Sequence, residues 1–255
     1  MNNVIAIVSQ KGGVGKSTTA INLSAALAHF NKQVLLIDMD PQGNSSHGLG
    51  VDVSLISKSI YDVFANDYDI NKVIRKTPCK NLDLISPKLI LSNLELDVYG
   101  KVEKPQYLLK DYMEKINKNY DYVIIDCPPS LGLLTTISLS ACKTVLIPVQ
   151  CEYFAQNAIS QILAFISTIQ NTYNPTLSIE GFLLTMYDPK IRLAVEVASE
   201  IRGLFKNNTF ITTIPRNISL VESEVKGIPV TMYRPTSSGS KAYISLAKEI
   251  MDNHK

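Results

Sequence analysis

The sequence has few of the residues that build metal or disulfide scaffolds, and it carries almost no excess charge. Its 255 residues include no tryptophan and only four cysteines, none of them in a C-x-x-C pair, which excludes zinc-ribbon spacing. Four cysteines are also too few for a disulfide-stabilised secreted scaffold. Lysine and arginine number 25 against 23 aspartates and glutamates, for a net charge of +2. Any contact with nucleic acid must therefore come from a local basic patch.

Long apolar runs are missing as well. No run approaches the roughly 18 residues that a membrane-spanning helix needs. The apolar run at residues 4–8 is too short for a signal sequence and follows no basic segment. The three histidines, His29, His47 and His254, are scattered along the chain and indicate no metal site. We therefore expect a cytoplasmic enzyme or switch, with no membrane association.

Short apolar runs alternate with helical patterns along the chain. The runs are rich in valine, isoleucine and leucine, which predicts strands buried on both faces, as in a parallel sheet. They lie at residues 4–8, 34–37, 82–85, 122–125, 145–149 and 182–184. Helical spacing of apolar residues predicts helices at 17–30, 106–116, 155–169, 193–205 and 241–251. We predict an α/β fold, a doubly wound and mostly parallel sheet flanked by helices, in one domain over residues 1–255. The irregular segment 51–104 is interpreted as a surface insertion.

The clearest motif lies between the first predicted strand and the first predicted helix. Residues 9–18 read SQKGGVGKST, which fits the phosphate-loop pattern G-x-x-x-x-G-K-[ST] except that Gln10 replaces the first glycine. Backbone N–H groups of such a loop turn toward an anion, and the helix N-terminus adds partial positive charge. We expect Lys16 to reach the β- and γ-phosphates of a nucleotide and Ser17 to bind Mg²⁺. The loop amides expected to bind phosphate belong to Gly12, Gly13, Val14 and Gly15. The alternative is a glycine-rich turn with two surface lysines.

Three aspartates come at or just after the ends of predicted strands, namely Asp38, Asp40 and Asp126. Ligands bind at the carboxyl ends of parallel strands in open α/β sheets. Carboxylates there can hold Mg²⁺, directly or through water, and can orient a nucleophile. Asp126 follows the apolar run 123–125, and this Walker B pattern predicts a water-mediated contact to Mg²⁺. Asp38 and Asp40 would face one side if their strand continues, and the alternative for each aspartate is a helix cap or turn.

The loop KGGVGKS at residues 11–17 resembles the deviant Walker A motif of the ParA/MinD family of dimerising ATPases. The resemblance is closest to the ParA-type, or Soj-type, partition ATPases, and further blocks of sequence carry it in the family's order. These blocks are AINL at 20–23, LLIDMDPQGN at 35–44, IIDCPPS at 124–130, PVQCE at 148–152 and IPRN at 214–217. The resemblance implies a P-loop NTPase fold of the deviant Walker A type.

The resemblance also implies a function and a set of site residues. It implies an ATP hydrolase that uses ATP and Mg²⁺, in which Asp40 positions the attacking water and Asp38 lies near the metal. Lys11 is the family's signature lysine, which reaches the nucleotide of the partner subunit, so Lys11, Lys16 and Asp40 are the catalytic candidates. Charge then arrives at the γ-phosphate only when two subunits meet.

The nucleotide site is completed, on the same resemblance, by Thr18 as a further phosphate ligand and by an adenine-contacting segment that contains Pro215 and Asn217. The implied partners are a second copy of the chain in the ATP state, nonspecific double-stranded DNA, and a ParB-type centromere-binding protein that stimulates hydrolysis. The implied role is chromosome or plasmid partitioning, and the implied location is the cytoplasm, at the nucleoid.

The candidates for DNA contact are basic residues in the C-terminal half, Lys190, Arg192 and Arg216. Relatives carry an arginine two residues after the Pro-Arg-Asn block, where this chain has Ser219. Glu222 and Glu224 follow and would oppose phosphate binding locally. These positions keep a second hypothesis open, an ATP-switched regulatory or positioning protein that acts through protein partners with little or no DNA binding.

Other relatives of the family suggest alternatives that the sequence does not favour. The nitrogenase iron protein holds an Fe–S cluster between subunits, which needs cysteines exposed at the dimer axis. Cys127, Cys142 and Cys151 instead lie in apolar surroundings, so we expect buried thiols. The cell-division relative MinD uses a basic amphipathic tail, whereas only residues 252–255 follow the last predicted helix. A tyrosine-kinase function would need a terminal tyrosine cluster, and Tyr233 and Tyr243 are isolated.

Overall fold

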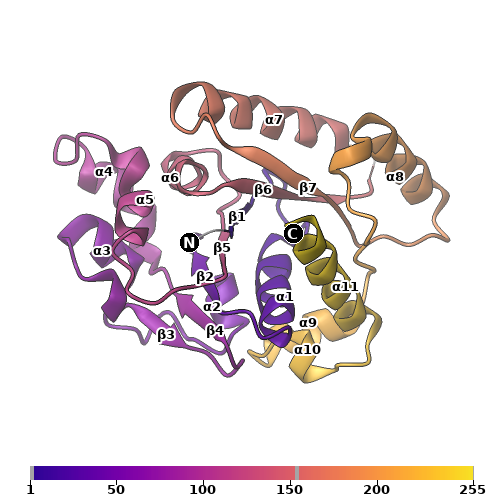
Figure 1. Cartoon of the computed structure of the whole chain (residues 1–255), viewed down its shortest axis with the longest axis horizontal. Coiled ribbons are helices and arrows are strands. Elements are labelled where there is room, and N and C mark those ends of the chain that lie inside the picture. The colour runs from indigo at the N-terminus through magenta and orange to yellow at the C-terminus, as the bar shows by residue number, and fades with distance from the viewer. Residues whose placement is uncertain (1–2, 153–154, 255) are drawn as a thin grey trace.

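A seven-stranded sheet forms the centre of the computed structural model, which describes residues 3–152 and 155–254 (Figure 1). Its strand order is β3-β4-β2-β5-β1-β6-β7. The strands are β1 (Asn3–Ile7), β2 (Val34–Asp38), β3 (Ile74–Lys76), β4 (Leu82–Ile85), β5 (Tyr122–Asp126), β6 (Thr144–Gln150) and β7 (Ser178–Thr185). Neighbouring strands run parallel except at the edge, where β3 pairs antiparallel with β4. The predicted parallel α/β sheet and its six predicted strands are confirmed.

Helices connect the strands and cover both faces of the sheet. The α-helices are α1 (Lys16–His29), α2 (Asn44–His47), α3 (Ile60–Asn66), α4 (Leu94–Val98), α5 (Leu108–Met113), α6 (Leu133–Ala141), α7 (Ala155–Thr172), α8 (Arg192–Leu204), α9 (Ile218–Val225), α10 (Val230–Tyr233) and α11 (Ser238–Asn253). The 3₁₀ helices are η1 (Ile70–Lys72), η2 (Leu89–Asn93), η3 (Pro105–Tyr107) and η4 (Lys206–Asn208). The five predicted helices correspond to α1, α5, α7, α8 and α11, and the prediction overestimated the length of α5.

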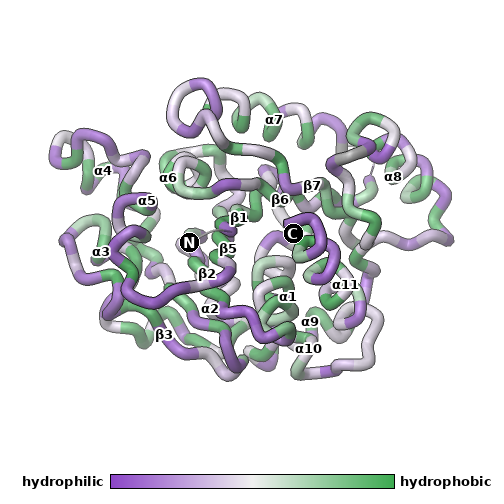
Figure 2. The backbone as a smooth tube through the Cα atoms, viewed as in Figure 1, coloured by the Kyte–Doolittle hydropathy of each residue, from purple (hydrophilic) through white to green (hydrophobic). Residues whose placement is uncertain are grey.

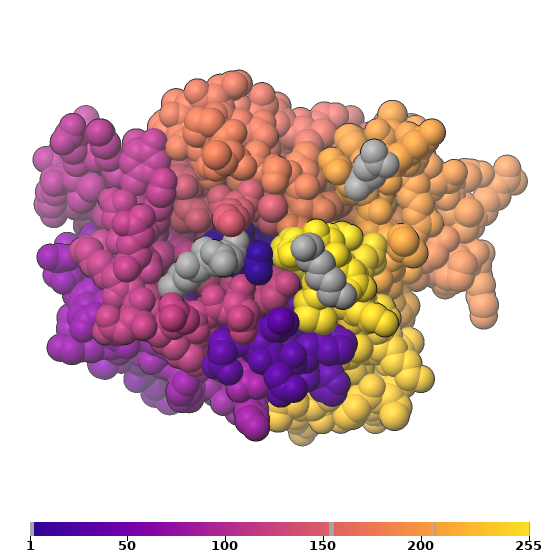
Figure 3. Space-filling model, viewed as in Figure 1, coloured from indigo at the N-terminus to yellow at the C-terminus, as the bar shows by residue number. Residues whose placement is uncertain are grey.

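Two apolar cores, one on each face of the sheet, hold these layers together. Successive residues of β1 point to opposite faces, as strand geometry requires, so Ala6 joins one core while Ile5 and Ile7 join the other. The first core lies against helices α3 to α8, and the second lies against α1, α9, α10 and α11. Figure 2 shows the hydrophobic colours gathered along the central strands. In Figure 3 the yellow C-terminal segment lies against the indigo N-terminal part, where α11 packs on α1.

The segment 51–104 differs from its interpretation as a surface insertion. It supplies two strands of the sheet, β3 and β4, and its short helices bury Val63, Phe64 and Leu94 in the first core. These helices are too short to show a helical period in the sequence, which explains the error. Because β3 is antiparallel and only three residues long, it also shortens the exposed edge of the sheet.

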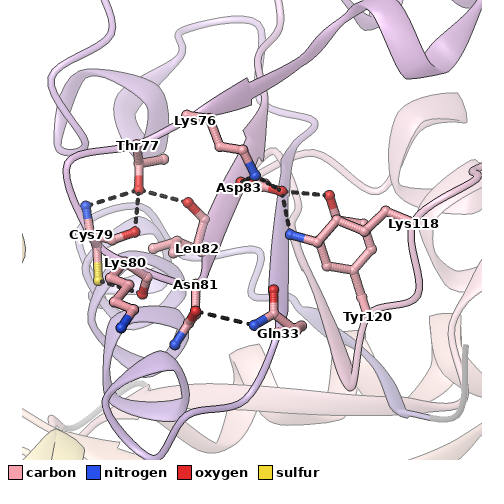
Figure 4. A network of polar contacts seen from close by, with 10 residues as sticks. All are labelled: Gln33, Lys76, Thr77, Cys79, Lys80, Asn81, Leu82, Asp83, Lys118 and Tyr120. Atoms are coloured by element: carbon pink, nitrogen blue, oxygen red, sulfur yellow. Dashed lines mark hydrogen bonds and ion pairs between the residues drawn. The ribbon is translucent and has the colours of Figure 1, made fainter.

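A network of charged groups joins β3 to β4 at the end of the sheet where β4 begins (Figure 4). The Asp83 carboxylate accepts hydrogen bonds from the Nζ atoms of Lys76 and Lys118, at 2.9 and 2.8 Å, and from the Tyr120 hydroxyl at 2.8 Å. Burial alone would raise the pKa of Asp83, but these donors outweigh it and lower the pKa. The antiparallel register places Lys76 opposite Asp83, so the ion pair supports the edge strand.

The strand order determines where a ligand can bind. The strands β2, β5 and β1 are neighbours, and in their register Asp126 lies beside both Asp38 and Ile7. The phosphate-loop sequence follows β1, and the predicted aspartates end β2 and β5. The sheet therefore brings these segments to the same edge, at its carboxyl end.

Candidate nucleotide-binding site

The loop after β1 has the backbone of an anion site. Gly13 and Gly15 have left-handed φ angles of 74° and 86°, which residues with a side chain rarely adopt. Gly15 is also the N-cap residue of α1, and no side chain caps that helix end. The first helical hydrogen bond runs from Thr19 N to Gly15 O, so the amides of the preceding residues remain available for a ligand. The predicted phosphate loop therefore has the expected conformation.

A pocket opens above this loop. It is lined by loop glycines and by Lys16, Ser17, Thr18 and Asp40. Further lining residues, which the sequence analysis did not identify, are Gln42, Asn44, His47, Gly48, Pro129, Met186, Glu224 and Val225. Lys16 is largely buried, with 8% of its surface exposed. The structure thus brings most of the predicted loop residues and Asp40 into one cavity, whereas Val14 is buried and does not line it.

Asp126 has the surroundings of a magnesium-supporting carboxylate. It is fully buried, accepts a hydrogen bond from Ser45 Oγ at 2.7 Å and lies next to Ser17. Burial raises the pKa of Asp126 to about 6, while Ser45, Ser17 and Lys16 oppose that rise. Among the described residues no group donates to its Oδ1 atom. A hydroxyl and a carboxylate are hard oxygen donors, so Ser17 and Asp126 fit Mg²⁺.

Asp38, which the resemblance places near the metal, lies beside Asp126 in the sheet and accepts hydrogen bonds from its own chain. Its Oδ2 atom accepts from the backbone N and the Oγ of Ser46, at 2.9 and 2.8 Å, and its Oδ1 accepts from Asp40 N at 3.2 Å. Burial, and next the neighbouring charge of Asp126, raise the pKa of Asp38. Asp38 is completely buried and does not line the pocket. It therefore holds the segment that carries Asp40, next to Asp126 in the sheet.

Asp40 lies outside the strand. We expected Asp38 and Asp40 to face one side if their strand continued. β2 ends at Asp38, so the two aspartates do not share a strand face. The Asp40 carboxylate accepts from Gln42 N at 3.0 Å and lines the pocket with little exposure. The bend after β2 thus directs Asp40 toward the space above the phosphate loop.

A second, more apolar pocket adjoins the first. It is lined by Ile214, Pro215, Leu220 and Val221, together with Arg216 and Asn217. The Asn217 side chain accepts from Ser219 N at 2.9 Å and donates to Ser238 Oγ at 2.7 Å, so it caps α9 and fixes this wall. Apolar walls with a few polar groups suit a nucleobase. The predicted segment with Pro215 and Asn217 is therefore next to the phosphate loop.

Lys11 points away from the phosphate pocket. It does not line that cavity, and its Nζ atom forms an ion pair with the carboxylate of Glu152, after β6. Neither group is buried. Lys11 therefore lies on the outer side of the loop and is not part of the phosphate pocket of its own chain.

The basic residues predicted to contact DNA lie on neighbouring segments. A bridge between Tyr187 and Pro215 brings the segment before α8 beside the one that holds Arg216. Lys190 is exposed, and Arg192 at the start of α8 forms an ion pair with Glu196 at 2.8 Å. Arg216 lines the apolar pocket. The structure thus places Arg216 at the nucleotide site as well as near the other two.

The four cysteines are all buried and free. Burial raises the pKa of Cys127 to about 12 and that of Cys151 to about 11, and it also raises the pKa of Cys142. Protonated thiols in the core pack as small apolar side chains. This confirms the expectation of buried cysteines. Within residues 3–152 and 155–254, no helix is both long and apolar enough to cross a bilayer.

Comparison with known proteins identifies the family. A family model described as an AAA domain matches residues 2–179. The chain is 44% identical over 253 residues to the sporulation initiation inhibitor protein Soj of Bacillus subtilis, covering 99% of this chain and 100% of that protein. It is 41% identical over 251 residues to the chromosome partitioning protein ParA of Myxococcus xanthus, covering 98% of this chain and 88% of that protein. The chain belongs to the ParA/Soj family of partition ATPases.

The fold of this ParA/Soj family member also occurs among solved structures. It is similar to cobyrinic acid a,c-diamide synthase from Mycobacterium smegmatis with a bound ATP analogue and magnesium, with a TM-score of 0.89 and 31% identity. The match covers 100% of this chain and 96% of that chain. The expected P-loop fold is therefore confirmed. The resemblance to the ParA/MinD family, which implied this fold, is confirmed as well.

Several contacts of this site were not found from the sequence. Ser45 donates to Asp126 and Ser46 donates to Asp38, and Glu224 lines the same pocket from α9. The two serines directly follow the block at residues 35–44, and this position beside a motif could have identified them from the sequence. Glu224 is far from the loop in sequence, and no motif there indicates that it belongs to the site.

Proposed function

We propose that this protein is a Mg²⁺-dependent ATPase whose ATP-bound state drives the partitioning of a chromosome or plasmid, with residues 1–255 acting as one ATPase domain. The observation that carries the proposal is the pocket at the ends of β1, β2 and β5. It combines an open phosphate loop, the Ser17–Asp126 pair and Asp40 beside an apolar pocket for a base.

Each residue has a task in the hydrolysis of ATP. Lys16 and the loop amides bind the β- and γ-phosphates, and the apolar pocket takes the adenine. Ser17 and Asp126 hold Mg²⁺, which neutralises charge on the phosphate oxygens. Asp40 orients a water molecule toward the γ-phosphorus, and the bond to the ADP oxygen breaks. Phosphoryl transfer needs positioning more than a strong base, so an aspartate suffices.

Dimerisation couples this chemistry to partitioning. Lys11 lies outside its own phosphate pocket, so after release from its ion pair with Glu152 it completes the site of a second copy. ATP then holds two subunits together, and hydrolysis separates them. The dimer binds nonspecific double-stranded DNA through Lys190, Arg192 and Arg216, and a ParB-type protein stimulates hydrolysis. The protein acts in the cytoplasm, at the nucleoid.

The proposal is tested by DNA binding of the purified protein with Mg²⁺ and either ATP or ADP, over a series of salt concentrations. We expect retention on duplex DNA of arbitrary sequence with ATP only, weakening steeply with salt because phosphate contacts displace counterions. Steady ATP hydrolysis measured alongside tests the enzymatic part. Absence of ATP hydrolysis and of ATP-dependent binding would contradict the proposal.

A second candidate is an ATP-switched positioning protein that does not bind DNA. Two ion pairs favour it, because they neutralise basic groups in the C-terminal half of the chain, one of them the DNA-contact candidate Arg192. Arg192 is paired with Glu196 at 2.8 Å, and Arg234 lies 3.8 Å from Glu222. An ATP-dependent dimer with no affinity for DNA at low salt would establish this candidate in place of the first.

A further inference from the structure

One carboxylate lies where the two pockets of the nucleotide site meet. The phosphate pocket and the apolar pocket share four lining residues, which are Gly15, Thr18, Met186 and Glu224. In any nucleotide the sugar joins the base to the phosphates. A nucleotide that occupies both pockets must therefore place its sugar at these shared residues, and Glu224 is the acidic one among them.

Glu224 lies beside the phosphate loop and has unused hydrogen-bonding capacity. It lies in the last turn of α9, and both pockets are lined by it and by Thr18, the third residue of α1. Its Oε1 atom is buried, and among the described residues no group donates to it. Burial raises the pKa of Glu224, and the neighbouring Thr18 side chain opposes this. A buried acceptor without a partner is costly, so it needs a donor when the site is filled.

The chemistry of the ligand decides which atoms can serve as that donor. Phosphate oxygens accept hydrogen bonds and carry negative charge, so they would repel the Glu224 carboxylate. The ribose hydroxyls are neutral donors, and a carboxylate has oxygens enough for a vicinal diol. Hydrogen bonds to a charged acceptor are also stronger than those between neutral groups.

We infer that Glu224 is the ribose-binding residue of this site, accepting hydrogen bonds from the sugar hydroxyls and making the protein selective for ribonucleotides. The inference rests on the proposed function, since it assumes that an adenine nucleotide occupies the two pockets. Thr18 on α1 lines the same region as Glu224, so the sugar is bound between the phosphate loop and the last turn of α9.

The test compares the affinities of ADP, 2′-deoxy-ADP and 3′-deoxy-ADP by titration calorimetry with Mg²⁺. Diphosphates are used because they are not hydrolysed. We expect wild-type protein to bind ADP about tenfold more tightly than the deoxy forms, as the loss of one hydrogen bond to a charged group predicts. In Glu224→Ala this preference should disappear through weaker ADP binding, and Glu224→Gln should retain part of it.

Glu222→Ala is the matched control, because Glu222 lies on the same helix but lines neither pocket. It should keep the wild-type preference. Equal binding of ADP and the deoxy forms by wild-type protein would overturn the inference and leave the proposed function intact. Tighter binding of all three ligands by Glu224→Ala would also overturn the inference, because it would show that the Glu224 carboxylate only repels the phosphates. No binding of ADP by wild-type protein would overturn both.

Discussion

Lys11 and Glu152 form an ion pair that ties the phosphate loop to the end of β6. The lysine that the family resemblance assigns to a partner's nucleotide is thus already bound to a carboxylate of its own chain. This contact must break before Lys11 can reach another subunit. In the dimer that we propose, the ion pair therefore opposes association, by an amount that its solvent exposure keeps small.

We expect Glu152→Gln to favour the ATP-dependent dimer. Exposed ion pairs contribute about 0.2–1 kcal/mol each, and a dimer breaks two of them, which corresponds to a lowering of the dimer dissociation constant by up to about 30-fold. Analytical ultracentrifugation with a non-hydrolysable ATP analogue measures this constant. Glu196→Gln, which removes the exposed ion pair with Arg192, is the control and should have no effect. A weaker dimer in Glu152→Gln would show that Glu152 supports the interface instead.

We expect Lys16→Ala to abolish measurable ATP binding. Lys16 is largely buried in the pocket and, among the residues that the structure describes, is the only lysine lining it, so its removal deletes the charge expected to face the phosphates. Loss of such charge-assisted bonds weakens affinity by about 100-fold or more. Calorimetric titration with ATP and Mg²⁺ measures the change. Retained affinity would show that the phosphate loop is wrongly assigned.

We expect Asp40→Ala to bind ATP without hydrolysing it. Asp40 lines the pocket but is not part of the loop that holds phosphates, so binding survives while water positioning is lost. The turnover rate should fall by about 10²–10⁴-fold. Phosphate release measures the rate, and the ATP-bound dimer should persist in ultracentrifugation. A wild-type rate in this variant would remove Asp40 from the mechanism.

We expect Asp83→Asn to lower the free energy of unfolding by about 2 kcal/mol at pH 7, because Lys76, Lys118 and Tyr120 lose a charged acceptor (Figure 4). The pKa of Asp83 is lowered in the folded protein. Its stabilisation is therefore present above the unfolded pKa of about 3.9 and disappears as pH falls through the folded value. Urea unfolding at pH 7 and pH 3 should show the difference at pH 7 and a smaller one at pH 3. An unchanged difference at both pH values would contradict the ionic origin.

The sequence predicted those parts of the site that depend on neighbouring residues. The phosphate loop and Asp126 each follow a buried strand directly, so motif and strand prediction place them together at one edge of the sheet. The hydrogen bonds from Ser46 to Asp38 could not be predicted in this way, because they depend on the bend that ends β2. Glu224 was interpreted only as a charge that opposes DNA, since its contact with Thr18 joins opposite ends of the chain.

The strands and helices of the fold were likewise predicted where neighbouring residues mark them and missed where they do not. Strands buried on both faces have a clear composition, and all six predicted strands lie in the sheet. The edge strand β3 has only three residues, partly exposed and basic at two positions, so no apolar run marks it. The helix α6 was also missed, because its serines and threonines hide the apolar period.

The strand order has a consequence for how the protein exchanges its ligand. The strands that carry the phosphate loop, Asp38 and Asp126 are the three innermost of the seven. Amide hydrogens on such central strands exchange slowest, since only near-global opening exposes them. The floor of the site is therefore the part of the fold that opens last, and any change of shape that accompanies ligand exchange is expected in the segments above it, of which the last turn of α9 is one.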